Sequence, residues 1–435
     1  MVLSVLDTRL VMNRIVSIPL GLLALALAGT PALAAGFLVR ENSAEALATS
    51  YAGNGSRASG PNTVFSNPAG MTRLTADGFE MGAAVILPSM TFNGVARSGG
   101  VPIAGNSGGD SGRAALIPNL YAAKRLSEDF SAGIAITAPF GNSNAYDSQW
   151  YGRYLGTKTA ALSLDINPNI AWQIDQTWSV GAGVSAQYLK LDVTSAINQA
   201  AIFGPGVPDA FYRFKAHDWA VGFNLGVLAQ FEDGTRLGLT YRSSVNHQIE
   251  GALDFTGASP LLGMVSGPAR AKARLPATMG LSLTRQVDEG LILSADVQFS
   301  QWSVFKDVTI QSQNPPFVNV QGYRDSWMVA VGGVYHLDER WSLKSGIAFD
   351  QTPVTSAYRA VTLADTDRYL LGVGASYALG GGMTVEGAWG HSFAFAKPNM
   401  NVSLNNTDPV THSVILNGSY DVDVNILAFS FRYAM

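Results

Sequence analysis

The chain has 435 residues, a net charge of -4 and only 14% charged residues, against the quarter or so that is usual in soluble globular proteins. Such a mild net charge gives no reason to expect a nucleic-acid partner. Because there is no cysteine, disulfides, thiolate metal sites and a cysteine nucleophile are excluded.

The first 34 residues are typical of a secretory signal peptide. Arg14 supplies a basic start, residues 20–27 are apolar, and Ala32-Leu33-Ala34 is a small-x-small cleavage site. We therefore expect residues 1–34 to be removed and the mature chain to begin at Ala35. An uncleaved anchor helix is the alternative, and Met12 rather than Met1 is a possible start.

After the signal peptide, no apolar run reaches the roughly 20 residues that a membrane helix needs. From Gly78 onward the chain instead alternates with a period of two. After Gly290, residues 291, 293, 295, 297 and 299 are apolar, whereas residues 294, 296, 298 and 300 are polar. Alternation of this kind indicates strands with one oily face, in a membrane barrel or in a soluble sandwich.

The connections between the strands favour the barrel. Short turns and long polar or Gly/Pro-rich stretches alternate, as in bacterial outer-membrane barrels. Trp178 and Trp341 each follow a short turn, and Trp219 follows a long stretch, as expected for aromatic girdles at two opposite rims. The short turns lie near residues 127–129, 175–177, 232–235, 287–290, 337–340 and 380–382, and the long stretches near 93–114, 141–158, 193–215, 252–270, 305–323, 353–367 and 397–412.

Six turns and seven loops predict an all-β fold, a 14-stranded antiparallel transmembrane β-barrel spanning residues 78–435. Residues 35–77 do not alternate, and we expect them to form an N-terminal helical hatch, or plug, inside the lumen. A flexible periplasmic extension is the alternative for this segment.

Several charged residues share the polar parity of these strands. A lipid-facing Lys or Arg at mid-bilayer costs about 2–4 kcal/mol, so we expect these side chains to point into the lumen or to lie near the rims. They are Arg236, Arg242, Lys272, Arg274, Asp296, Lys344, Asp350, Arg368 and Arg432.

Motifs along most of the chain resemble those of the FadL-type family of outer-membrane hydrophobe channels. The start at Ala35-Gly36-Phe37 and the short motif Asn67-Pro68-Ala69 both fit the family's hatch. Further resemblance comes from residues 151–154, 181–184, 275–278, 296–299, 323–327, 346–354 and 365–369.

The resemblance implies passive uptake of hydrophobic compounds, with long-chain fatty acids as the first expectation and aromatic hydrocarbons as the alternative. A ligand would be caught at the outer loops, bind near the start of the hatch, and leave sideways where a strand is kinked. It also implies a monomer in the outer membrane of a Gram-negative cell, in contact with membrane lipid and lipopolysaccharide.

The resemblance carries site residues with it. Phe37 is an expected apolar ligand contact, with ordinary packing of the plug as the alternative. Asn67, Pro68 and Ala69 form the expected hatch and gating motif. Basic residues at Arg324 and Lys190 are expected to bind a ligand carboxylate, although strict alternation places Lys190 on the lipid side. Pro139 and Gly141 mark the expected kink and lateral opening.

Enzymatic function is not expected. A lipid hydrolase would need a Ser-His-acid constellation, and none is evident around the five histidines, which are scattered without metal-ligand spacing. We therefore expect no catalytic residues, no metal and no cofactor. A general porin would lack so long a hatch, and an adhesin would have longer, repetitive outer loops.

Overall fold

The computed structural model describes residues 36–403 and 414–435. The predicted signal peptide, with its cleavage site, lies outside these residues. The strands are β1 (Gly78–Ser98), β2 (Val101–Pro102), β3 (Ala115–Arg125), β4 (Phe130–Thr137), β5 (Gly141–Ala145), β6 (Lys158–Gln173), β7 (Trp178–Ile197), β8 (Ala210–Gln230), β9 (Thr235–Arg242), β10 (Val245–Thr256), β11 (Gly267–Leu275), β12 (Thr278–Gln286), β13 (Leu291–Ser300), β14 (Asp307–Ile310), β15 (Phe317–Val320), β16 (Ser326–His336), β17 (Trp341–Asp350), β18 (Arg368–Gly380), β19 (Met383–Ala394), β20 (Asn399–Ser403) and β21 (Val414–Ala434).

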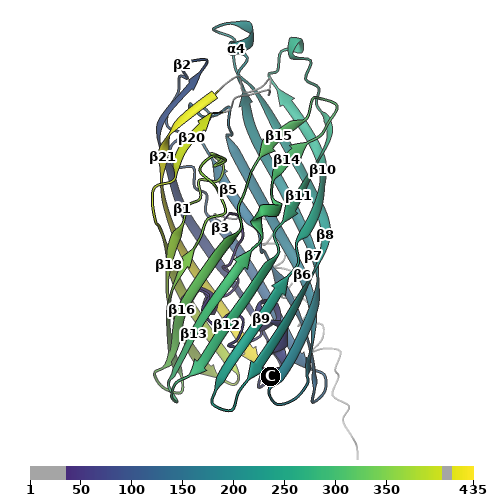
Figure 1. Cartoon of the computed structure of the whole chain (residues 1–435), viewed down its shortest axis with the longest axis vertical. Helices are drawn as coiled ribbons and strands as arrows, with labels where there is room; N and C mark the ends of the chain where they lie inside the picture. The colour runs from purple at the N-terminus through teal and green to yellow at the C-terminus, as the bar shows by residue number, and fades with distance from the viewer. Residues whose placement is uncertain (1–35, 404–413) are drawn as a thin grey trace, which may run out of the picture.

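The described strands form a closed antiparallel barrel of 14 strands (Figure 1). Its seam is the pairing of β1 with β21, which runs from Gly78 opposite Ala434 to Ser98 opposite Val414. Four barrel strands are interrupted and carry two labels each, namely β4–β5, β9–β10, β11–β12 and β19–β20. The predicted fold class is confirmed.

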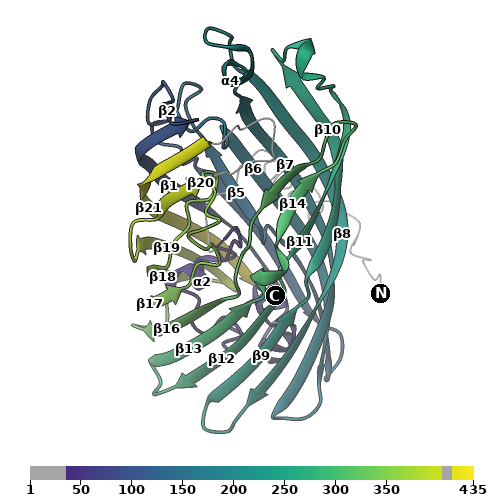
Figure 2. The same ribbon diagram turned by 45° about the horizontal axis from the view of Figure 1, so that its top comes forward.

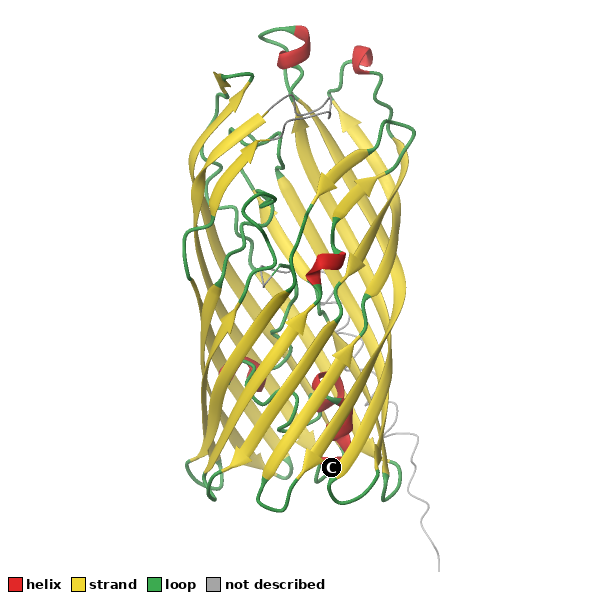
Figure 3. Ribbon diagram, in the orientation of Figure 1, coloured by secondary structure: helices red, strands yellow, loops and turns green. Residues whose placement is uncertain are grey.

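The two ends of the barrel differ, as the sequence predicted. Short turns close one end and longer connections, with the hairpins of β2 and β14–β15, lie at the other (Figures 1 and 3). We call these the short-turn end and the long-loop end. Several strands run further into the expected loops than the sequence suggested: β7 continues to Ile197 and β8 begins at Ala210.

In the half of the barrel next to the short turns, large apolar side chains face outward, whereas small polar and small apolar ones are common on the inward face. On β8, Val221 is 72% exposed, whereas Asn224 is 3% exposed. Trp178 and Trp341 lie at the short-turn end of this outward apolar band and Trp219 lies toward its other rim, all exposed. This arrangement is that of a lipid-facing surface between two aromatic girdles. Among the described residues, no helix is long and apolar enough to cross a membrane.

In the half next to the long loops the two faces exchange character. On β9, Leu237 and Leu239 face outward. Beyond the break at residues 243–244, Ile249 and Leu253 on β10 are fully buried while Gln248 is exposed. A single extra residue in a strand turns every later side chain to the opposite face. β12 and β11 exchange faces in the same way across Pro276, which has no N–H to donate to a neighbouring strand.

The helical segment before β1 lies inside the short-turn half (Figures 2 and 3). It comprises α2 (Ala44–Ala48), α3 (Thr63–Ser66) and the 3-10 helix η1 (Pro68–Arg73). The remaining helices lie in loops: α4 (Ala200–Phe203), η2 (Pro260–Leu262) and η3 (Trp302–Val304). We call residues 36–77 the hatch.

Side-chain caps explain where two of the hatch helices begin. The Ser43 hydroxyl accepts a hydrogen bond from the Ala46 backbone N–H at 3.0 Å, and the Asn67 side chain accepts one from the Ala69 N–H at 3.1 Å. Each bond satisfies an amide that helix geometry leaves without a partner.

Candidate functional site

The interior of the long-loop half is apolar. Buried side chains of β1, β7, β8, β10, β11, β20 and β21 meet there with residues of the long loops, including Met90 of β1, Phe214 of β8 and Tyr420 of β21. The same cluster contains the first residues of the hatch. An apolar interior beyond the lipid-facing band is able to hold an oily molecule away from water.

Phe37 lies in an aromatic box at the inner end of this apolar interior. Its ring centroid is 4.7 Å from that of Trp302, 5.1 Å from Phe305 and 6.0 Å from Phe140. Tyr323 closes the box at 5.7 Å from Trp302. These separations are those of attractive edge-on aromatic pairs. Phe37, although part of the hatch, is therefore packed firmly against the wall residues.

The backbone around Phe37 joins the interrupted strand β4–β5. The Val39 N–H donates to the Pro139 carbonyl at 2.8 Å, and the Gly141 N–H donates to the Phe37 carbonyl at 2.8 Å. Between these bonds, Leu38 and Phe140 form an isolated antiparallel bridge. On the side facing β3, the backbone at residues 139–141 therefore forms its hydrogen bonds with the start of the hatch and not with β3.

Between β3 and the kinked strand the wall has a gap in its backbone pairing. β3 pairs with β4 from Arg125 only as far as Leu120, and the next contact is the bridge of Gly112 to Asn144. Three buried side-chain atoms near this gap have no hydrogen-bond partner within the described residues: Asn119 Oδ1, Thr137 Oγ1 and Asn142 Oδ1. Buried polar atoms are rarely left without partners, so the gap offers contacts to a polar group.

A cavity of about 110 Å³ lies between the hatch and the wall, at the level of the strand breaks. It is lined by apolar groups such as Pro139 and Phe140 and by the guanidinium groups of Arg40 and Arg242. Arg242 is paired with Asp165 at 3.2 Å and lies 4.0 Å from the centre of the Phe65 ring.

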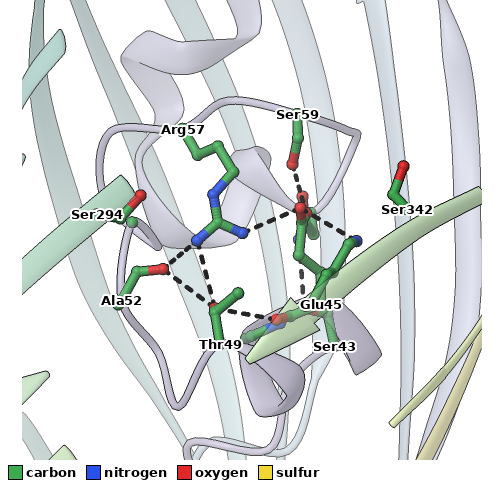
Figure 4. Close-up of polar contacts among 12 residues, drawn as sticks. Ser43, Glu45, Thr49, Ala52, Arg57, Ser59, Ser294 and Ser342 are labelled. Atoms are coloured by element: carbon green, nitrogen blue, oxygen red, sulfur yellow. Dashed lines mark hydrogen bonds and ion pairs between the residues drawn. The ribbon is translucent and has the colours of Figure 1, made fainter. Parts of the chain in front are cut away.

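A buried network of charges ties α2 to the wall of the barrel. Lys344 on β17 contacts Glu45 at 3.3 Å and Glu386 on β19 at 2.6 Å, and Arg57 contacts Glu45 at 3.1 Å. Figure 4 shows that the same guanidinium also reaches Thr49 and the Ala52 carbonyl. Two cations thus balance two carboxylates, an arrangement that is stable only while all four are present.

The charge state of Glu45 follows from this network. Burial by itself raises the pKa of a carboxyl group, but Lys344 and Arg57 outweigh it and hold the pKa of Glu45 well below its ordinary value of 4.5. The carboxylate is therefore ionised at neutral pH.

A second network fixes the start of the hatch. Asp350 on β17 contacts both Arg40 at 3.1 Å and Arg368 at 2.8 Å. The Gly36 N–H donates to the Asp365 carboxylate at 2.8 Å. The segment that carries Phe37 is thus held at both ends.

Glycines in the wall allow the hatch backbone to come close. A β-carbon at Gly346 would overlap the Thr49 carbonyl oxygen, and one at Gly372 would overlap that of Leu47. These positions explain why α2 is able to lie directly against β17 and β18.

Asn67 joins the hatch to the wall as well as capping η1. Its amide nitrogen donates to the Gly55 carbonyl at 2.7 Å and to the Val227 carbonyl on β8 at 3.1 Å. Pro68 and Ala69 follow as the buried first residues of η1. The contacts are structural, and a gating role for the three residues stays a prediction.

The two basic residues expected to bind a carboxylate lie elsewhere. Arg324 is in the segment before β16 rather than in a strand; it is exposed, 3.7 Å from Asp367, and lines no described cavity near Phe37. Lys190 is exposed on the outward face of β7, as strict alternation implied. The geometry gives no support to a lumen contact from either.

The charged polar-parity residues divide at the strand breaks. Lys344, Asp350 and Asp296 meet the hatch inside the barrel, as expected. Lys272 and Arg274 are exposed on the outer face of β11. They do not point into the lumen, because the break at Pro276 turns the strand over; they lie instead near the rim, the other expected position.

Sequence reasoning missed the partners of Phe37 and the charges of the hatch. Trp302, Phe305 and Tyr323 lie in a stretch interpreted as strand end and loop, with no periodicity to place them. The ion pairing of Arg40, Glu45 and Arg57 could have been anticipated from the sequence, because a charged residue buried in a plug needs a partner of opposite charge in the lumen.

A family model described as outer membrane protein transport protein (OMPP1/FadL/TodX) matches residues 25–435. The chain belongs to this family. It is accordingly an outer-membrane transport protein and not an enzyme, so the predicted location is confirmed and the lipid hydrolase alternative is dropped. The short-turn end then faces the periplasm and the long-loop end faces outward.

Individual members of the family support the assignment. The chain is 26% identical to the long-chain fatty acid transport protein of Escherichia coli K12 over 399 residues, 83% of this chain and 89% of that one. It is 27% identical to outer membrane protein P1 of Haemophilus influenzae over 405 residues, 83% and 87% of the two chains.

Solved structures share the fold. A Pseudomonas aeruginosa FadL homologue superposes with a TM-score of 0.87 at 23% identity, covering 92% of this chain and all of the other. The Pseudomonas putida toluene transporter TodX gives a TM-score of 0.64 at 17% identity, covering 90% and 98%.

Proposed function

We propose that this protein takes up hydrophobic compounds passively across the outer membrane, with long-chain fatty acids as the main substrate class. The observation that carries the proposal is the exchange of faces between the two halves of the barrel. It gives the outward-projecting half an apolar interior, where an open porin would have a polar one.

The dimensions of this interior suit an acyl chain. The buried apolar positions of β10 run from Val245 to Leu253, roughly 25 Å along the strand at a rise of about 3.3 Å per residue. Relatives named as long-chain fatty acid transport proteins match most of the chain, and this also favours the fatty-acid proposal.

The proposed route runs from the apolar interior to the aromatic box and then sideways. A chain that enters from the long loops reaches Phe37, which is joined by backbone bonds to the kinked strand. Displacement of Phe37 would loosen the segment at Pro139 and Gly141, beside the gap in the wall. The unpartnered polar atoms at the gap would receive the polar head of the ligand.

Aromatic hydrocarbons are the second candidate. The box of Phe37, Trp302, Phe305 and Tyr323 presents ring edges and faces at the separations that aromatic groups prefer. Such a ligand has no head group and would leave the polar atoms at the gap unused.

The proposal includes action as a monomer in contact with membrane lipid and lipopolysaccharide. The barrel is closed by its own first and last strands, which leaves no strand edge at the seam for pairing with a second copy.

Competition binding separates the two substrate classes. The chain without its signal peptide, purified in detergent, is loaded with a fluorescent long-chain fatty acid, and oleate and toluene are added as displacers. Phe37→Ala and Arg324→Ala are tested beside Phe429→Ala, whose ring is 65% exposed on the lipid face and serves as a matched control.

We expect oleate to displace the probe and toluene to do so only weakly. Phe37→Ala removes an apolar contact and should weaken oleate binding on the order of tenfold, whereas Phe429→Ala should not. The exposed position of Arg324 leads us to expect no loss from Arg324→Ala. Displacement by toluene alone, or no binding of the probe, would overturn the fatty-acid proposal.

A further inference from the structure

The outer surface of the long-loop half carries a basic patch on β7, β8 and β11. On β11 the three successive outward residues Arg270, Lys272 and Arg274 are exposed cations, and β7 and β8 add more. We define the basic patch as Lys190, Lys215, His217, Arg270, Lys272 and Arg274, all of which are exposed.

Strand register gathers these residues into one surface. Lys190 lies opposite His217, His217 opposite Glu250, and Glu250 opposite Arg270. In the next rows Gln248 lies opposite Lys272 and Asn246 opposite Arg274. Outward neighbours on adjacent strands are within reach of one another, so a single ligand is able to contact several of them.

The charges of the basic patch are not neutralised by the protein. Within residues 36–403 and 414–435, Lys190, Lys215 and Lys272 form no ion pair, and Arg270 and Arg274 have only the neutral partners Gln311 and Ser244. Cations nearer the loop tips differ in having an acidic partner.

Lys158 and Arg213 both bind Asp192, at 2.8 and 2.7 Å. β10, which lies between β8 and β11, carries two exposed acids, Glu250 and Asp254. They are fewer than the lysines and arginines of the basic patch, so the patch keeps a net positive charge.

The patch begins where the lipid-facing band ends. On β8 the exposed residues Val221 and Trp219 come directly before His217 in the outward row. The Tyr188 ring lies 5.3 Å from that of Trp219 and 5.9 Å from that of His217. Aromatic side chains of this kind mark the boundary between hydrocarbon and head groups. The basic patch therefore lies at the level of the outer head groups.

Among the described residues, β21 on another side of the barrel carries acids on its outward face, Asp421 and Asp423. Asp421 is paired with Lys397 and bonded to Asn93 of β1 at 3.0 Å, and Asp423 lies 3.4 Å from His391. The positive charge is a local feature of β7–β11 and not a general property of the long-loop half.

We propose that the basic patch binds the phosphate groups of lipopolysaccharide, the anionic glycolipid of the outer leaflet. Flexible ammonium groups and forked guanidinium groups at head-group level match phosphates in charge and in hydrogen-bonding capacity. The acyl chains of the same molecule would lie against the apolar band below. The site is outside the barrel, so it does not depend on which compound the lumen transports.

Binding of purified lipopolysaccharide to the full mature chain in detergent tests the proposal. The patch variant replaces Lys190, Lys272 and Arg274 by Gln. A control variant replaces Arg97, Lys124 and Lys306 by Gln, which are exposed cations outside the patch. Intact and chemically dephosphorylated lipopolysaccharide are compared, with inorganic phosphate as a competitor. Resistance of the folded barrel to heat and protease is checked for each variant.

The patch variant should bind intact lipopolysaccharide at least about tenfold more weakly than the wild type, with the control variant unchanged. Dephosphorylated material should bind weakly to all three proteins. Equal binding by the patch variant and the wild type, or equal binding of dephosphorylated and intact material, would overturn the proposal.

Full displacement by inorganic phosphate would also overturn it and indicate a simple anion site. If the patch variant is not folded, the single variant Lys272→Gln is compared with the wild type in the same binding assay, and a smaller loss of affinity for intact lipopolysaccharide is expected. Oleate binding should be the same in the patch variant, so failure here is distinct from failure of the transport proposal.

Discussion

The two halves of the barrel use the same strands and the same alternation in opposite ways. In the periplasmic half the outside is apolar, and the lumen is filled by the hatch, which packs against the wall through buried apolar side chains and buried polar and charged ones. In the outward half the inside is apolar and the outside is polar or charged. The exchange on the β9–β12 side of the wall needs only two strand breaks, at residues 243–244 and at Pro276.

The difference separates two tasks. The outward half provides apolar surface to a ligand, and the periplasmic half closes the lumen with charges that are paired across the hatch and the wall. Because those charges are satisfied only in the docked arrangement, the hatch is able to stay in place while a ligand leaves through the wall.

The largest expected effect comes from breaking the charge network of the periplasmic half. Lys344→Met would leave Glu45 and Glu386 buried without their shared cation, at a cost of about 3–5 kcal/mol. We expect faster hydrogen exchange in α2 and leakage of small polar solutes through the channel. Lys124→Met, at an exposed position near the short turns, is the control. Unchanged exchange in Lys344→Met would mean that the network does not hold the hatch.

A pair of substitutions on the two sides of the break in the β9–β10 wall strand tests the boundary between the halves. Leu239→Arg puts a cation in the lipid-facing band and should cost about 2–4 kcal/mol. Gln248→Arg lies beyond the break on the outward polar face and should change stability by about 0.5 kcal/mol or less. Denaturant unfolding in lipid vesicles measures both. Equal costs would contradict the exchange of faces.

A smaller effect is expected from filling a close contact between the hatch and the wall. Gly346→Val places a side chain against the Thr49 carbonyl and should cost about 1–3 kcal/mol. Gly387→Val is matched to it, because a β-carbon there meets only the Phe429 ring at 3.5 Å. Hydrogen exchange of residues 44–49 should rise in the first variant alone; a rise in both would show that the barrel itself has been weakened.

The smallest effect concerns pH. The pKa of Glu45 is lower in the docked hatch than its ordinary value of 4.5, so its carboxylate stabilises docking above that pH and loses this contribution as the pH falls below it. Hydrogen exchange in α2, corrected for the intrinsic chemical rate, should be constant between about pH 5 and 8 and rise in stronger acid. Loosening near pH 6 would contradict the assigned charge state.

The sequence predicted the strands because alternation and turns are local features. The turns near 127–129 and 380–382 lie at the expected end of the barrel, and Trp219 is at the rim opposite Trp178. The pattern could not show that alternation restarts out of phase after Ser243 and Pro276, because an extra residue is visible only once a neighbouring strand fixes the register.

The site was less predictable for the same reason. Lys344 and Glu45 are far apart in sequence, and nothing local to either indicates the other. The strand is interrupted between Thr137 and Gly141, where a proline disfavours continuous pairing, whereas the pairing of this segment with Phe37 was not predictable; a lateral opening there stays a prediction. The boundaries proposed for signal peptide, hatch and barrel stay predictions.

The most direct test of the exchange of faces as a transport device is to locate a bound ligand. The mature chain would be crystallised with a brominated long-chain fatty acid, and the bromine located by its anomalous scattering. We predict bromine inside the outward half, next to the box of Phe37 and Trp302. Bromine found only on the lipid-facing surface, or only within the periplasmic half, would contradict the proposed route.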